Sequence, residues 1–302
     1  MGLNLDPRQR AMLEEMGIRV WSPLTQAALA TTTVQPEPDA LAGVSERVAP
    51  QSAPRERTVQ AAHLTAPAPA DLQPRVAGVE SMGWAALQQA VAGCRACALC
   101  SGRRHTVFGM GGFVPPSADQ PPAADWLIVG EAPGEQEDLS GWPFVGPAGQ
   151  LMDNMLKAMG LDRHREVVLG EGKAAQGTYI ANVLKCRPPS NRNPEGDEVA
   201  QCLPYLRRQI DLLQPKIILT MGRFAAQALL HDSVPDVHGQ PLGKLRGQVH
   251  RYRGIPVVVT YHPAYLLRAM GDKAKAWADL CLAMQAFATL TCSKPGVDTA
   301  EA

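Results

Sequence analysis

Residues 126–146 read WLIVGEAPGEQEDLSGWPFVG, and this stretch decides the fold class and the place of a binding site. Its apolar start, 126–130, is typical of a buried strand, and a loop rich in glycine and proline that carries Glu131 follows directly. Open α/β sheets bind their ligands in loops at the carboxyl ends of strands. We therefore expect the segment after residue 130 to form one wall of a pocket.

Apolar runs and amphipathic segments alternate along the rest of the chain. The expected strands are 126–130, 178–186, 216–222 and 255–260. The expected helices are 148–160, 197–213, 224–230 and 274–290. Strands that alternate with helices predict an α/β fold, in which a parallel sheet carries helices on both faces.

The composition divides the chain into four parts. Residues 1–21 have the pattern of an amphipathic helix, and 22–82 are rich in Ala and Pro, which is typical of a flexible linker. The folded domain is expected at 83–292, followed by a loose tail at 293–302. The first helix is a candidate for binding a protein partner; the alternative is a helix that docks on its own domain.

The charges and the apolar runs of the chain bear on whether it binds nucleic acid, spans a membrane or is secreted. Lys and Arg number 29 and so do Asp and Glu, so the overall charge gives no sign of a nucleic-acid partner. Residues 241–275, however, hold seven basic residues and one acid, which is either a DNA-facing surface or an ordinary solvated one. No run is long and apolar enough for a membrane span, and the start of the chain lacks a secretory pattern. We expect a monomeric, cytoplasmic protein with no membrane contact.

The cysteines suggest a metal site. Cys94, Cys97 and Cys100 form a dense group, and Cys186 and Cys202 follow far downstream. Thiolates bind zinc and iron–sulfur clusters alike, and the second Cys-x-x-Cys pair of a zinc ribbon is missing. The alternative is that the two downstream thiols are small buried hydrophobes.

Three further side chains are candidates for a pocket. Asn182 lies in an apolar strand, where an amide is costly unless it is hydrogen-bonded, so it either reads a ligand or makes a structural bond. His262 follows the last expected strand and is either a site residue or a satisfied structural histidine. Phe144 lies among glycines and a proline, as a stacking platform or as a plug of the core.

Six features in register resemble one protein family. Besides the cysteine pattern they are VGEAPGEQED (129–138), PFVGPAGQLMD (143–153), YIANVLKCRPPSNRNP (179–194), KLRG (244–247) and TYHPAYLLR (260–268). Together they resemble the family-four uracil-DNA glycosylases, the iron–sulfur members of the uracil-DNA glycosylase superfamily. The resemblance runs from about Cys94 to Leu290 and does not cover residues 1–82.

The resemblance implies a fold and a cofactor. The fold is a three-layer α/β/α sandwich around a short parallel sheet. The cofactor is a structural [4Fe-4S] cluster held by Cys94, Cys97, Cys186 and Cys202, with Cys100 as a bystander.

The resemblance also implies an activity, the excision of uracil from DNA. Uracil inside a duplex is unreachable, so it must swing out into a pocket. There Phe144 would stack on the ring, Asn182 would read O4 and N3–H, and His262 would donate a hydrogen bond to O2.

Further roles follow from the same resemblance. Glu131 is the candidate for orienting the attacking water, and backbone N–H groups at Ala132 would help to stabilise the leaving base. Glu137 would line the C5 side of the ring and help to exclude thymine. Arg187, Arg246 and Arg268 would contact uracil-containing DNA, single- or double-stranded.

The sequence is compatible with three other interpretations of the function. Some relatives trap the abasic sugar through a histidine in an inserted loop, but the segment 187–194 is short and lacks that insert. A non-catalytic DNA-binding or polymerase-associated accessory protein would share the fold. A zinc-stabilised nucleotide-binding module would be colourless, whereas an iron–sulfur protein is brown.

Overall fold

The computed structural model describes residues 72–112, 121, 124–164 and 177–292. The helix expected at 1–21, most of the expected linker and the tail at 293–302 lie outside the described residues. Residues 72–82, expected in the linker, pack on the domain, since Val79 is buried and Arg75 Nη1 donates to the carbonyl of Gln201 at 3.3 Å. The packed region therefore includes Val79.

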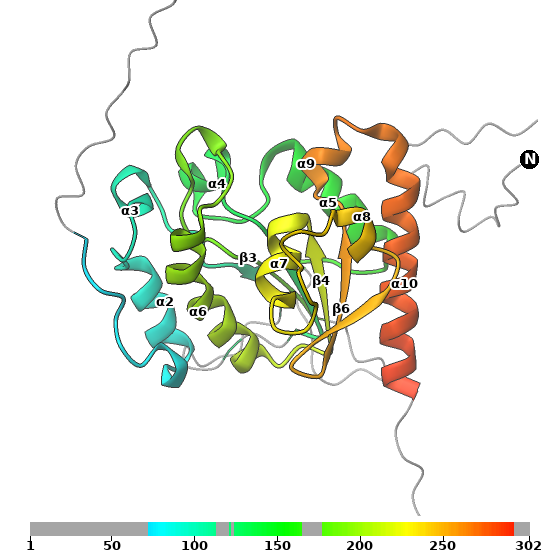
Figure 1. Ribbon diagram of the computed structural model, residues 1–302, viewed down its shortest axis with the longest axis horizontal. Helices are drawn as coiled ribbons and strands as arrows, with labels where there is room; N and C mark the ends of the chain where they lie inside the picture. Colours follow the sequence, from blue (N-terminus) through cyan, green and yellow to red (C-terminus); the bar gives the residue numbers. More distant parts are fainter. Residues whose placement is uncertain (1–71, 113–120, 122–123, 165–176, 293–302) are drawn as a thin grey trace, which may run out of the picture. The chain divides into compact units, whose positions relative to one another are not determined.

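The centre of the domain is a six-stranded sheet in the order β1-β3-β2-β4-β6-β5 (Figure 1). Its strands are β1 (Met110–Gly111), β2 (Trp126–Gly130), β3 (Thr178–Asn182), β4 (Ile217–Met221), β5 (Val249–Tyr252) and β6 (Ile255–Thr260). Strands β3, β2, β4 and β6 run parallel, and β1 and β5 pair antiparallel at the two edges. Every residue of β2, β3 and β4 is buried, as expected for parallel strands covered on both faces.

Helices connect the strands and cover the sheet. The α-helices are α2 (Trp84–Ala92), α3 (Leu99–Gly102), α4 (Glu135–Ser140), α5 (Gly146–Ala158), α6 (Gly196–Leu213), α7 (Arg223–Leu230), α8 (Leu242–Leu245), α9 (Pro263–Leu266) and α10 (Lys273–Cys292). Short 3₁₀ turns are η1 (Val79–Ser81), η2 (Pro189–Asn191) and η3 (Met270–Asp272).

The two faces of the sheet bury different side chains. Leu127 and Val129 of β2 belong to one apolar cluster with residues of α2, α6 and α7. Trp126 points to the other face, where its ring lies 4.9 Å from that of Phe287 on α10. The expected three-layer α/β fold is confirmed, with helices on both sides of a mostly parallel sheet (Figure 1).

Two features of the sheet differ from the sequence-based expectation. The strand expected at 178–186 ends at Asn182, because its neighbour β2 has by then turned into a loop. The edge strands β1 and β5 were not expected. β1 has only two residues, and β5 is largely exposed, so neither carries a clear apolar pattern.

The parallel strands bring their carboxyl ends to one edge of the sheet. Gly130, Asn182, Met221 and Thr260 end β2, β3, β4 and β6 there. The loops that follow carry most of the candidate residues. No helix in the described part of the chain is both long and apolar enough to cross a bilayer.

Candidate functional site

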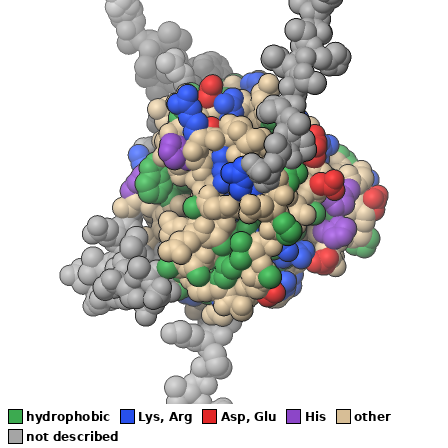
Figure 2. Space-filling model, turned by 90° about the vertical axis from the view of Figure 1, so that its left-hand side faces the viewer, with side chains coloured by type: hydrophobic (Ala, Val, Ile, Leu, Met, Phe, Trp, Pro, Cys, Tyr) green, Lys and Arg blue, Asp and Glu red, His purple; other side chains and the backbone are tan. Residues whose placement is uncertain are grey.

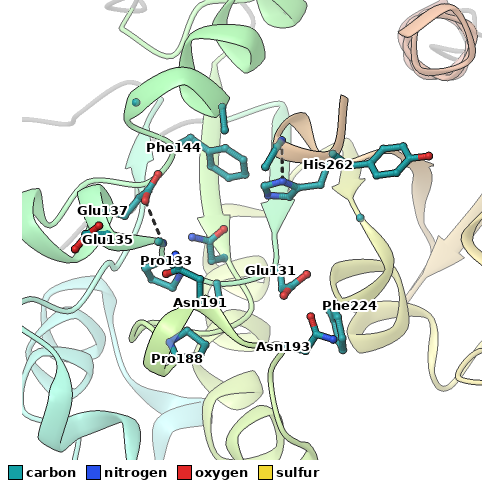
Figure 3. Close-up of a pocket in the computed structure, with 18 of the residues that line it drawn as sticks. Glu131, Pro133, Glu135, Glu137, Phe144, Pro188, Asn191, Asn193, Phe224 and His262 are labelled. Atoms are coloured by element: carbon teal, nitrogen blue, oxygen red, sulfur yellow. Dashed lines mark hydrogen bonds between the residues drawn. The ribbon is translucent and has the colours of Figure 1, made fainter. Parts of the chain in front are cut away.

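A cavity of about 710 Å³ opens at this edge of the sheet. Glu131, Phe144 and His262 line it (Figure 3), and so does Asn182. The structure therefore brings together four side chains that are up to 131 residues apart in the sequence. Ala132, Glu137 and Arg268 also line the cavity.

The Phe144 ring lies beside the His262 ring at the cavity (Figure 3). The two rings are stacked, with centroids 5.4 Å apart and an interplanar angle of 27°. Phe144 has a φ of +52°, which is uncommon for a residue other than glycine. A Cβ on Gly130 would lie 2.6 Å from Phe144 Cζ and would overlap Asn182 Oδ1. A glycine at 130 therefore lets the ring and the amide approach the strand end closely.

Asn182 presents an unsatisfied amide to the cavity. The residue is 2% exposed, and its Oδ1 is buried without a partner among the described residues. A buried oxygen that accepts no hydrogen bond costs about 1–3 kcal/mol. A ligand with an N–H donor would recover that cost.

His262 is half-buried at the N-cap of α9, and its tautomer follows from one contact. Its Nδ1 accepts a hydrogen bond from the backbone N–H of Ala264 at 3.2 Å. Nδ1 therefore carries no proton, and in the neutral ring the proton is on Nε2. Burial, helped by the charge of Arg268, lowers the pKa of His262 to about 4. The imidazole is thus a neutral N–H donor at physiological pH.

Glu131 directly follows β2 and lines the same cavity. Burial raises the pKa of its carboxyl to about 7, although Arg223 opposes the shift. A carboxylate whose pKa lies close to the working pH can orient or activate water.

Both carboxylate oxygens of Glu137 accept hydrogen bonds from backbone N–H groups. Its Oε2 accepts from Gly134 N at 3.0 Å, and its Oε1 accepts from Val145 N at 3.1 Å. The side chain thus ties the start of α4 to the segment that carries Phe144. The exclusion of thymine by Glu137 stays a prediction.

The three candidate DNA-binding arginines differ in their surroundings. Arg187 donates from Nε to Asn191 Oδ1 at 2.8 Å, and Arg268 lines the cavity. Arg246 is mostly buried, with Nε 2.7 Å from Asp279 Oδ2 and its guanidinium 4.1 Å from the centre of the Tyr261 ring. Their contacts with DNA stay predictions.

Cys94, Cys97, Cys100, Cys186 and Cys202 line a second, small cavity. In the described ranges, no three His, Cys, Asp or Glu side chains are grouped so as to hold a metal ion. Burial raises the pKa of Cys186 to about 11 and that of Cys202 to about 12, so without a cation both remain thiols.

Two N–H groups point at these sulfurs. Arg103 Nη1 donates to Cys186 Sγ at 3.2 Å, and the backbone N–H of Lys185 donates to Cys202 Sγ at 3.2 Å. Hydrogen bonds of this kind stabilise sulfur that carries negative charge.

No sequence pattern singles out Lys185 as a residue of either site. Its ammonium is fully buried and donates to the carbonyl of Asn182 at 2.9 Å, to that of Phe108 at 3.2 Å and to Gln209 Oε1 at 2.6 Å. Lys185 therefore joins the end of β3 to α6 and to the segment at Phe108. A lysine near the end of the expected strand 178–186 reads as a solvated residue, and only the fold reveals its burial.

Comparison with known proteins gives a consistent result. The family model described as Uracil DNA glycosylase superfamily matches residues 117–281. A protein of Sulfurisphaera tokodaii named type-4 uracil-DNA glycosylase is 40% identical over 186 residues, which cover 60% of this chain and 74% of the relative. Proteins of the same name from Archaeoglobus fulgidus and Saccharolobus solfataricus are 38% and 37% identical, over 58% of this chain and 78% and 72% of the relatives.

Proposed function

Because the chain belongs to the uracil-DNA glycosylase superfamily, we propose that it excises uracil from DNA as a type-4 enzyme. It hydrolyses the N-glycosidic bond and leaves an abasic site. The observation that carries this proposal is one cavity that combines a stacked aromatic ring, an unsatisfied amide and a neutral imidazole. The test is the release of uracil from a synthetic oligonucleotide by the purified protein. An intact strand after alkaline treatment would refute it.

The flipped base enters the cavity beside Phe144. Uracil inside a duplex is inaccessible, and unstacking it costs a few kcal/mol. The Phe144 ring offers an apolar face at the carboxyl edge of the sheet and stacks on the base.

Asn182 selects uracil by the polarity of its edge. The N3–H of uracil donates to Oδ1, and O4 accepts from the amide nitrogen. Cytosine has an acceptor at N3 and a donor at C4, so both contacts would be lost and buried polar groups would stay unpaired. The free Oδ1 of Asn182 supports this role.

His262 and the backbone at Ala132 stabilise the departing base. Cleavage places positive charge on the sugar and negative charge on uracil O2. The Nε2–H of His262 donates to that oxygen, and the preorganised donor needs no reorganisation during the reaction. Because the ring is neutral, it gives no proton away at physiological pH.

Glu131 supplies the negative charge that faces the sugar. As a carboxylate it stabilises the cationic sugar and orients the attacking water. Its position in the same cavity as His262 supports this assignment.

The pH dependence of the rate tests the role of Glu131. The carboxylate form is lost as pH falls through the raised pKa of about 7. We expect the single-turnover rate to be constant above that pH and to fall about tenfold per unit below it. Glu131→Gln should be slower and should lose this slope. A wild-type rate that is flat between pH 5 and 8 would remove Glu131 from the reaction.

DNA would cross the end of the domain that carries the cavity. Figure 2 shows that one face bears Lys and Arg side chains near its upper end, the end at which α3 and α4 lie in Figure 1. Arg187 and Arg268 would contact phosphates there, which positions DNA without reading its sequence. Arg246 would act by supporting Tyr261 and the neighbouring ring of Tyr265, 5.0 Å away.

We further propose a [4Fe-4S] cluster on Cys94, Cys97, Cys186 and Cys202. Five thiols line one cavity, with N–H donors on two of them, and four of these thiols would supply the ligands that such a cluster needs. A cluster spaces its ligands more widely than a single ion does, which is compatible with the absence of a compact metal group in the described ranges. Bound there, the cluster would cross-link the segment before α3 to the segment after β3 and to α6.

Metal analysis of cysteine variants tests the ligand set. We expect the purified protein to be brown, with about four irons per chain. Cys186→Ser should lose colour, iron and stability. Cys100→Ser and the control Cys281→Ser, on α10, should keep all three. A colourless protein that contains zinc would favour the zinc interpretation.

The division of the chain into four parts, a partner for residues 1–21 and the monomeric state stay predictions. The comparisons give no support to a non-catalytic accessory protein.

A further inference from the structure

A buried arginine lies behind the segment that carries Phe144. Arg163 follows α5 and is 8% exposed. Its Nη1 donates to the carbonyl of Pro143 at 2.9 Å, and its Nη2 donates to the carbonyl of Phe144 at 2.9 Å. Nη2 also lies 2.8 Å from Asp153 Oδ2, which fixes the guanidinium from the side of α5. The two carbonyls are thus held by one planar group.

The segment needs such support because its backbone is strained. Phe144 has a φ of +52°, and a residue with a side chain adopts this region only where its surroundings impose it. Helix α5 approaches so closely that a Cβ on Gly149 would overlap the Phe144 carbonyl oxygen. The conformation of Phe144 decides where its ring points, and that ring lines the cavity next to His262.

A second charged side chain holds the other end of the peptide group between Phe144 and Val145. Glu137 Oε1 accepts from Val145 N at 3.1 Å. Arg163 and Glu137 together therefore fix the carbonyl of residue 143, the carbonyl of residue 144 and the N–H of residue 145. The two peptide groups on either side of Phe144 are thus held by side chains from outside the segment.

We propose that Arg163 is a positioning residue of the glycosylase, which acts by holding the Phe144 ring in its stacking orientation. This inference rests on the proposed function, since the ring matters only if a base stacks on it. Arg163 contacts backbone behind the ring and does not line the cavity. Lysine cannot replace it fully, because one ammonium cannot match the planar fork that spans two carbonyls and a carboxylate.

A double-mutant cycle separates positioning from general stability. A misplacement of about 1 Å can cost on the order of 100-fold in rate, so we expect Arg163→Lys to lower the single-turnover rate of uracil release to about that degree. In a Phe144→Ala background, where no ring is left to position, Arg163→Lys should change the rate by about twofold or less. Equal losses in both backgrounds would overturn the proposal.

Binding measurements give a second readout. Arg163→Lys should weaken the inhibition by free uracil in proportion to the lost rate, because the free base needs the ring. Its affinity for DNA with an abasic site should stay within about twofold of wild type, because that product has no base to stack. Parallel weakening of both ligands would point to a purely structural role.

Rescue of an Arg163 variant by added guanidinium distinguishes a lost side chain from a protein that fails to fold. A cavity of about 250 Å³ lined by Asp153 and Arg163 lies on this side of the molecule and offers a route for a small cation. Guanidinium at millimolar concentration should restore part of the activity of Arg163→Gly and should leave Phe144→Ala unchanged. Failure to rescue a folded Arg163→Gly would count against the proposal.

Arg208→Lys is the matched control. Arg208 also donates to a backbone carbonyl, that of Met82 at 2.7 Å, but it does not line the cavity. It should keep the wild-type rate. If the wild-type protein itself releases no uracil, the proposed function fails; if it is active and the cycle is additive, only the inference on Arg163 fails.

Discussion

Asn182→Ala should abolish the distinction between uracil and cytosine. A site that pairs buried polar groups with its substrate can reject an analogue by a factor of about 10⁴–10⁵. Without the amide, neither base edge is read, and we expect the ratio of the uracil rate to the cytosine rate to fall to about 10 or less. Most of the fall should come from a slower uracil reaction, because two hydrogen bonds are lost.

The measurement is single-turnover release of each base from otherwise identical single strands. Single strands remove the difference in pairing energy between the two bases in a duplex. Asn154→Ala is a suitable control, because Asn154 lies on α5 and does not line the cavity. A variant of Asn182 that still prefers uracil by several thousandfold would show that another group reads the base.

The fold could be anticipated because its core strands carry a strong signal. The fully buried β2, β3 and β4 are continuous apolar runs, and such runs between amphipathic helices indicate a parallel sheet. The edge strand β1 has two residues, too few for any period, and its place is set by pairing with β3. Tertiary contact rather than local sequence forms it.

Site residues could be predicted where a polar side chain lies in or directly after an apolar strand. Asn182 in an apolar strand and His262 after another strand are such cases, and both line the cavity with Glu131 and Phe144. Family resemblance, rather than spacing, joined them into one pocket. The tautomer of His262 needed the Ala264 contact, which no sequence pattern reveals.

The buried residues that support the site could not be predicted from the sequence, because no local pattern distinguishes them from surface residues. Arg163 lies in a polar stretch after a helix, and Lys185 lies near the end of the expected strand 178–186, so both read as surface residues. Each is buried because its charged group finds several carbonyl or carboxylate oxygens from distant segments. Such partnerships depend on three-dimensional approach, which one sequence does not encode in any local pattern.

His262→Ala should slow uracil release by about 10²–10³-fold, because removal of one preorganised donor to a developing oxyanion has that effect. The loss should be similar at all pH values above about 5, since the wild-type imidazole, with a pKa near 4, is already neutral there. Exposed His238 offers a control, and His238→Ala should keep the wild-type rate. A loss that appears only below pH 6 would instead indicate a protonated, charged histidine.

The leaving group provides the sharper test of this role. 5-Fluorouracil is a more acidic base, so its anion needs less stabilisation from a hydrogen bond at O2. His262→Ala should therefore lose much less on 5-fluorouracil than on uracil, by a factor of about 10 or more. Phe144→Ala removes stacking rather than charge stabilisation, and it should slow both bases to a similar extent. Equal losses for the two bases in His262→Ala would mean that the imidazole holds the base in place and does not stabilise the charge that forms as the bond breaks.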